Sequence, residues 1–227
     1  MARTKRNAVR RRLVAAIGLA VLLLAGWAWW EAGEWRPSRA RFPVQGAEVG
    51  TADGTVNFAA LKAGGADFVY LDAAANPRFE ADLAGAQAAG LQVGAVHRFD
   101  LCRDAEAQIG AFVTQVPRDP KLLPPAVALD LDEEGCPAPP AAEALQSELT
   151  TFLNQLEAHT GKPAILKLSP AFEARYHFAG MIDRNLWLTG GYLAPGYAGR
   201  PWVMWTANPR LRSPAADARL HWVAVRP

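Results

Sequence analysis

The sequence predicts an α/β protein, namely an irregular (β/α)8-like barrel with few helices in its C-terminal third, preceded by one N-terminal transmembrane helix. Eight short apolar segments recur between residues 44 and 225, and helix-like segments separate the first five. Apolar strands that alternate with helices indicate a parallel sheet, and eight of them can close a barrel. An uncharged stretch at residues 13–30 predicts the transmembrane helix.

The segment before the barrel has the charge pattern of a membrane anchor. Residues 1–12 carry six basic residues and no acidic one, and the 18 residues at 13–30 carry no charge. Such a stretch is just long enough to cross a hydrocarbon core of about 30 Å. Because basic flanks stay in the cytoplasm, we expect a single-pass signal-anchor in a bacterial inner membrane, with the remainder in the periplasm or outside the cell. A secretory signal peptide is the alternative, and residues 31–42 are predicted to form a linker.

Charge and cysteine content narrow the class of protein. Residues 36–227 contain 18 basic and 20 acidic residues and therefore lack the basic excess typical of a nucleic-acid-binding domain. Cys102 and Cys136 are the only cysteines, and in an oxidising compartment we expect one disulfide between them. Two separately buried thiols are the alternative. The four histidines are scattered without zinc-binding spacing, so no metal or cofactor is predicted.

The elements of the barrel, residues 43–227, follow from local signals in chain order. The first two helices end at glycine, which favours a helix C-terminus, and the last carries a leucine and phenylalanine stripe at helical spacing. The late strands are joined by segments rich in Gly and Pro. Strands are predicted at 44–49, 67–72, 91–97, 126–131, 163–168, 185–190, 201–206 and 219–225, and helices at 56–65, 78–90, 104–116 and 141–161.

Acidic side chains lie where the working groups of a barrel are expected, at the carboxyl ends of its strands. The first two predicted strands end at Glu48 and Asp72, and the fourth ends at Asp130 and Asp132 in the stretch ALDLDEEGC. Two residues that are two positions apart on a strand point to the same face, about 6.5–7 Å apart. One of two such close carboxyl groups can keep its proton toward neutral pH, as a general acid must.

Other side chains at strand ends complete this pattern. His97 ends the third predicted strand, and Trp187 and Trp205 lie near the ends of the sixth and seventh. Carboxylates beside aromatic rings are typical of a site that cleaves glycosidic bonds. Each feature also has a structural alternative: the acidic segment 130–134 could be a solvated turn or a divalent-ion site, and His97 and the tryptophans could be core residues.

With the strands placed, the sequence resembles glycoside hydrolase family 25 lysozymes, the Chalaropsis-type muramidases, over roughly residues 43–206. VQGAEVG is similar to the family's first strand, AAGLQVGAVHRF to its third unit and LPPAVALDLD to its P-x-V-L-D-x-E motif. The resemblance implies an irregular (β/α) barrel that hydrolyses the β-1,4 bond between N-acetylmuramic acid and N-acetylglucosamine in peptidoglycan. It also implies a retaining mechanism without a metal, in which the substrate's own acetamido group is the nucleophile.

The resemblance implies roles for individual residues. The family's acid/base glutamate matches Asp132, the aspartate two residues earlier matches Asp130, and the first-strand aspartate matches Glu48. The cysteines also match those of one exported subgroup. Peptidoglycan glycan strands are the expected partner. The side chains expected to bind them are Tyr70, His97, Trp187, Tyr192 and Trp205.

The sequence departs from the family pattern at several catalytic positions. Asp132 is one methylene shorter than the family's glutamate, and Glu48 is one methylene longer than its aspartate. A misplacement of about 1 Å can lower a rate on the order of a hundredfold. Ala75 replaces a further glutamate, and Arg219 falls near a late aspartate. Two functions therefore remain open: a membrane-anchored muramidase that uses Glu48, Asp130 and Asp132, and a catalytically degenerate member that binds peptidoglycan or an envelope partner.

Overall fold

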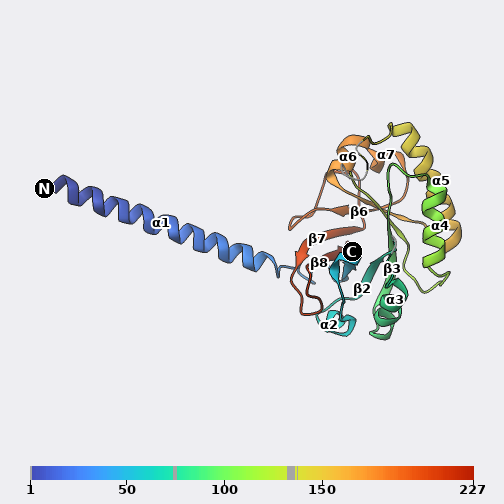
Figure 1. The fold of residues 1–227 in the computed structure, drawn as a ribbon, viewed down its shortest axis with the longest axis horizontal. Helices are drawn as coiled ribbons and strands as arrows, with labels where there is room; N and C mark the ends of the chain where they lie inside the picture. The colour runs from blue at the N-terminus through green and yellow to red at the C-terminus, as the bar shows by residue number, and fades with distance from the viewer. Residues whose placement is uncertain (1, 74–75, 132–135, 137) are drawn as a thin grey trace. The chain divides into compact units, whose positions relative to one another are not determined.

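The computed structural model describes residues 2–73, 76–131, 136 and 138–227. Two compact units make up the chain, Met1–Trp35 and Arg36–Pro227. The first unit is essentially one helix, α1 (Ala2–Ala32), which is shown in Figure 1. It contains the predicted membrane segment, but none of the helices in the described part of the chain is both long and apolar enough to cross a bilayer. The predicted transmembrane helix is therefore not supported.

The second unit is a closed barrel of eight strands that follow one another in chain order around the sheet. This confirms the predicted barrel. Each predicted strand overlaps an observed one. The strands are β1 (Gln45–Val49), β2 (Phe68–Asp72), β3 (Gln92–Arg98), β4 (Ala126–Leu129), β5 (Ile165–Leu168), β6 (Asn185–Thr189), β7 (Met204–Leu211) and β8 (Leu220–Val225).

The barrel is mixed, which corrects the expectation of a parallel sheet, and its irregular part is in the C-terminal third, as predicted. β1 to β7 are parallel to their neighbours, but β8 runs antiparallel to both β7 and β1. Only residues 212–219 connect β7 to β8. A parallel crossover needs a dozen or more residues, whereas antiparallel strands can be joined by a short connection. The short connection therefore accounts for the reversed direction of β8.

Helices surround the strands on the outside of the barrel (Figure 1). Four of them occupy the predicted connections: α2 (Phe58–Ala63), α3 (Phe79–Ala88), α4 (Ala105–Gln115) and α5 (Ala142–Thr160). Two short helices that we did not predict follow β5, namely α6 (Pro170–Tyr176) and α7 (Phe178–Met181). The start of α6 has a clear local cause, because the Ser169 side chain accepts a hydrogen bond from the Phe172 N–H and Pro170 suits the first turn.

Large side chains fill the interior of the barrel, so it is a packed core. Tyr70 and Trp187 lie edge to face there, with ring centroids 5.1 Å apart. Their polar atoms are satisfied: the Tyr70 hydroxyl donates to the Pro124 carbonyl at 2.9 Å, and the Trp187 Nε1 donates to the Thr206 hydroxyl at 2.9 Å. The ring of Tyr70 fits because residue 94 is a glycine, since a Cβ atom there would overlap it.

Candidate active site

The carboxyl ends of β1 to β7 share one end of the barrel, which we call the rim, and the first residues of antiparallel β8 lie there too. The inner-face residues of five strands, β2 to β5 and β8, include Tyr70, Val96, Ala128, Ile165 and Val223. Side chains two positions away on the same strand leave the same face and lie at the rim. The ionisable rim residues found in this way are Asp72, Arg98, Asp130, Lys167 and His221, and Glu48 joins them through its contacts.

Glu48 is engaged in a buried ion pair. Lys167 Nζ donates to both carboxylate oxygens of Glu48 at 2.5 Å, and His221 Nδ1 lies 3.4 Å from one of them. The ammonium group of Lys167 also lies 4.9 Å from the ring centroid of Trp187. Glu48 and Lys167 are both buried. The first-strand acid is therefore present at the rim, but its carboxylate faces a lysine from the opposite wall.

The electrostatics of this pair keep Glu48 ionised. Burial by itself raises the pKa of the Glu48 carboxyl, but the opposing effects of Lys167 and His221 are larger together and lower the pKa to about 2. A carboxylate of this kind has no proton to donate near neutral pH. Sequence reasoning missed Lys167. The available signal was a single lysine inside the otherwise apolar strand ILKL.

Sequence reasoning also missed an acid near Glu48, Asp53. Asp53 follows β1 in a short 3-10 turn, and its Oδ2 accepts a hydrogen bond from the Gly50 N–H at 2.6 Å. Partial burial raises the pKa of the Asp53 carboxyl, and the charges of Glu48 and Asp72 act in the same direction. The Gly50 N–H and His221 oppose the rise without cancelling it. Asp53 thus holds a proton more readily than Glu48.

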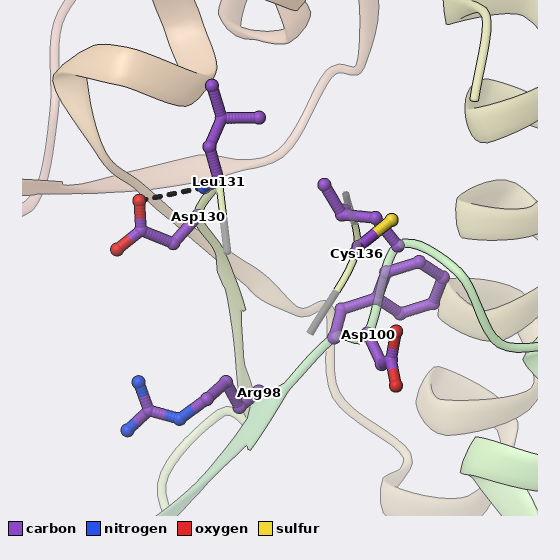
Figure 2. Close-up of a pocket in the computed structure, with 7 residues that line it drawn as sticks. Arg98, Asp100, Asp130, Leu131 and Cys136 are labelled. Carbon is purple, nitrogen blue, oxygen red and sulfur yellow. Dashed lines mark hydrogen bonds between the residues drawn. The ribbon is translucent and has the colours of Figure 1, made fainter. Parts of the chain in front are cut away.

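Asp130 has a solvent-exposed carboxylate at the rim, whereas Glu48 and Asp72 are buried. It directly follows β4 and is exposed, and its Oδ1 accepts a hydrogen bond from the Leu131 N–H at 2.8 Å. It lines a pocket of about 400 Å³, which is shown in Figure 2. The described residues that line this pocket are Arg98, Phe99, Asp100, Leu101, Asp130, Leu131 and Cys136. The predicted acid Asp132 and the substituted position Ala75 lie outside the described residues.

The predicted disulfide is confirmed. Cys102, after β3, is bonded to Cys136, after β4, with Cα atoms 5.5 Å apart. Cys136 also lines the pocket. The cross-link therefore ties together the two chain segments that leave the neighbouring strands β3 and β4 at the rim.

The side chain of His97 points away from the barrel interior, so its predicted role in substrate binding is not supported. It alternates with the inner-face residues Val96 and Arg98 and therefore points outward. There its ring stacks on Phe152, with centroids 4.7 Å apart, and its Nε2 lies 3.3 Å from the Gln108 side-chain oxygen. Burial lowers the pKa of the His97 imidazole. The structural alternative, a core histidine, is the one observed.

The four aromatic residues predicted to bind substrate lie in different environments. Tyr70 and Trp187 form the floor of the barrel below the rim and are fully buried. Trp205 is buried outside the barrel wall, where it packs against Phe42 with ring centroids 5.7 Å apart. Tyr192 alone is partly exposed, in the loop after β6, and its hydroxyl accepts a hydrogen bond from Arg210 Nε at 2.8 Å.

The rim shows no arrangement suited to a metal within the described residues. In that part of the chain, no group of three or more His, Cys, Asp or Glu side chains could hold an ion.

Arg219, which falls near a family aspartate, is exposed, and its Nη1 donates to the backbone carbonyl of Arg210 at 3.4 Å. Lys167, and not Arg219, is the cation that contacts Glu48 at the barrel mouth.

Comparison with known proteins gives the family. The sequence profile of Glycosyl hydrolases family 25 matches residues 48–207, which is most of the barrel. The chain belongs to this family. The predicted resemblance and the predicted class, a glycoside hydrolase, are thereby confirmed. A search of curated protein sequences found no match.

Solved structures support the fold of this family 25 member. A family 25 glycosyl hydrolase from Bacillus anthracis is 21% identical with a TM-score of 0.75, over 85% of this chain and 92% of that one. A bacterial lysozyme from Streptomyces coelicolor is 20% identical with a TM-score of 0.71, over 80% and 91%. A family 25 lysozyme from Aspergillus fumigatus is 19% identical with a TM-score of 0.68, over 81% and 94%.

Proposed function

We propose that this family 25 member is a muramidase that cleaves the β-1,4 bond between N-acetylmuramic acid and N-acetylglucosamine in peptidoglycan. The observation that carries the proposal is the position of Asp130, an exposed carboxylate at the carboxyl end of β4 that lines a pocket at the rim. Barrel enzymes build their active sites at this end. Family membership supports a peptidoglycan hydrolase in general terms.

In the proposed mechanism, Asp130 orients the 2-acetamido group of the muramic acid unit. The acetamido oxygen attacks the anomeric carbon while the bond to the leaving oxygen breaks, and Asp132 gives its proton to that oxygen. Asp132 then takes a proton from the water that opens the cyclic intermediate, so the anomeric configuration is retained. Proton transfer of this kind contributes on the order of 10²–10⁴-fold to a rate.

The purified full chain tests this mechanism with isolated peptidoglycan as substrate. We expect new reducing ends on muramic acid, and a loss on the order of a hundredfold or more for both Asp130→Asn and Asp132→Asn. Asp183→Asn is the matched control, because Asp183 is exposed and lies just before β6, at the end of the barrel opposite the rim. If the wild type releases no more reducing ends than the Asp130→Asn/Asp132→Asn double variant, catalysis by these residues is rejected.

A second candidate function is a catalytically degenerate module that binds peptidoglycan or an envelope partner. The buried Glu48–Lys167 pair favours it, because a first-strand acid that is neutralised by a lysine is poorly placed to act on a substrate. This function predicts saturable cosedimentation with cell wall and no new reducing ends. The Asp130→Asn/Asp132→Asn variant would then cosediment as well as the wild type. If the chain does not cosediment with cell wall, peptidoglycan binding is excluded.

We also infer that the barrel works outside the cytoplasm, in the periplasm or beyond, and that α1 associates with membrane lipid. The disulfide favours an oxidising compartment. Large apolar side chains of α1 between Ile17 and Trp30 are exposed, and an uncovered apolar surface of this kind suits a lipid or protein partner. Deletion of residues 13–30 should move the protein from the membrane to the soluble fraction. An unchanged distribution would reject the role of α1.

A further inference from the structure

We propose that the pocket beside Asp130 is a subsite for a carboxylate of the muramic acid unit, and that Arg98 recognises it. The inference rests on the proposed function, because it takes a peptidoglycan strand to be the ligand of the rim. The inference names the chemical group, a carboxylate, by which the site would distinguish the muramic acid unit from N-acetylglucosamine.

The register of the sheet places Arg98 next to Asp130. Arg98 and Ala128 are Cα partners on the neighbouring strands β3 and β4, and Asp130 lies two positions beyond Ala128. Both side chains therefore leave the inner face of the sheet, with Cα atoms about 8 Å apart from the usual strand spacing and rise per residue. In Figure 2 their charged groups extend to the same side of the strands, and Asp100 extends to the other.

The guanidinium of Arg98 is available to a ligand. The Arg98 side chain is 64% exposed, although its Nη2 lies 3.5 Å from the buried Asp72 carboxylate. Contact with Asp72 through one nitrogen leaves the other donors of the guanidinium fork for a second partner. A planar fork of this kind binds carboxylates through two parallel hydrogen bonds.

The rest of the pocket suits a small anionic substituent. Of the described residues that line it, Arg98 is the only cation. Two acids also line it: Asp130, which the proposed mechanism assigns to the acetamido group, and Asp100, which extends to the other side of the strands in Figure 2 and whose Oδ1 accepts a hydrogen bond from the Cys102 N–H at 2.9 Å. Phe99, Leu101 and Leu131 supply apolar lining. A group that combines a carboxylate with a methyl group would match both parts of this surface.

Muramic acid carries such a group, and N-acetylglucosamine does not. Its C3 oxygen bears a lactyl ether, which has one methyl group and one carboxyl group, and C3 is bonded to the carbon that bears the acetamido group. If Asp130 holds the acetamido group, the substituent on the next carbon can reach the neighbouring strand, where Arg98 lies. The carboxylate is either the free lactyl group of a strand without peptide or a carboxylate of the attached stem peptide.

Binding measurements on the full chain, in the Asp132→Asn background to prevent turnover, test the subsite. The ligands are a peptide-free glycan strand with free lactyl carboxylates, the same strand with those carboxylates converted to methylamides, and strands that retain stem peptides. We expect the free carboxylate strand to bind about tenfold or more tightly than the methylamide strand. Arg98→Gln should abolish this difference and Arg98→Lys should keep part of it. Arg118→Gln, at an exposed arginine in the loop before β4, should leave the difference unchanged.

The outcomes separate the two proposals and the two ligand sources. Preference for the peptide-free strand assigns the site to the lactyl carboxylate, and preference for strands with peptides assigns it to the stem peptide. If neither the free carboxylate strand nor the strand with peptides binds more tightly than the methylamide strand, or if Arg98→Gln keeps such a difference, the subsite is rejected, while cell-wall hydrolysis by the wild type would still support the muramidase. If no strand binds and none is cleaved, the proposed function fails together with the subsite.

Discussion

The Glu48–Lys167 pair is the feature of the rim with the largest expected effect on stability, and Lys167→Met tests it. The substitution keeps an unbranched side chain of similar length but leaves the buried carboxylate of Glu48 without its main partner. The pKa of Glu48 lies at about 2 in the folded protein and near 4.5 for a free carboxyl. A difference of that size corresponds to about 3 kcal/mol of stabilisation at pH 7. Removal of one member of a buried ion pair typically lowers the free energy of unfolding by about 3–5 kcal/mol, which agrees with the value from the pKa difference.

The sign of the pH dependence follows from the direction of the shift. Because folding lowers the pKa of Glu48, its contribution is fully present above about pH 4.5 and is lost as the pH falls toward 2. In Lys167→Met, burial of the carboxylate remains while the main opposing charge is gone. Protonation of Glu48 should then relieve the defect, so the difference from the wild type should shrink as the pH falls.

Urea denaturation followed by tryptophan fluorescence, at pH 7 and at pH 3, measures both effects. Lys167→Met should lower the free energy of unfolding by about 3 kcal/mol or more at pH 7. The double variant Glu48→Gln/Lys167→Met, which carries no charge at either position, should recover most of that loss. Lys121→Met is the control at an exposed lysine. The reasoning is refuted if Lys167→Met lies within about 1 kcal/mol of the wild type, or if the double variant is as unstable as the single one.

Three further predictions concern the packing that supports the rim. Gly94→Ala should destabilise the barrel by about 1–3 kcal/mol in urea denaturation, because the new Cβ atom overlaps the Tyr70 ring; an unchanged midpoint would contradict this packing. Loss of the disulfide in Cys102→Ser/Cys136→Ser should cost about 4 kcal/mol, given the sequence separation of 34 residues, and should make the melting temperature insensitive to reductant. The pKa of His97 is lowered by burial, so the wild type should lose stability as the pH falls below about 6.5. His97→Phe should remove that part of the pH dependence. If the stability of His97→Phe has the same pH profile as that of the wild type, His97 is not the cause.

Sequence periodicity was sufficient for most of the fold, because it records where chain segments are buried. Apolar runs located all eight strands, and glycines located the ends of helices. Strand direction is a different property, since an apolar run has the same composition in either direction. The reversal of β8 could have been inferred only from the length of the connection after β7, residues 212–219.

The candidate site was predicted less well, because a position at a strand end does not say which face a side chain takes. Strands of a barrel covered by helices are buried on both faces, so alternation of polar and apolar residues is weak. His97 and Arg98 are neighbours in the sequence, and only the register shows that Arg98 points inward. Lys167 was missed for a related reason, since its partner Glu48 is distant in sequence and the pair forms only when the barrel closes.

The filled floor of the barrel limits how a long polymer can meet the rim. Tyr70 and Trp187 close the interior directly beneath it, so a chain cannot thread through the barrel and must lie across the mouth. A strand that lies across the mouth does not need to enter by a free terminus. The proposed muramidase should therefore engage a glycan strand at interior units, and the fragments it releases from a long strand should vary widely in length.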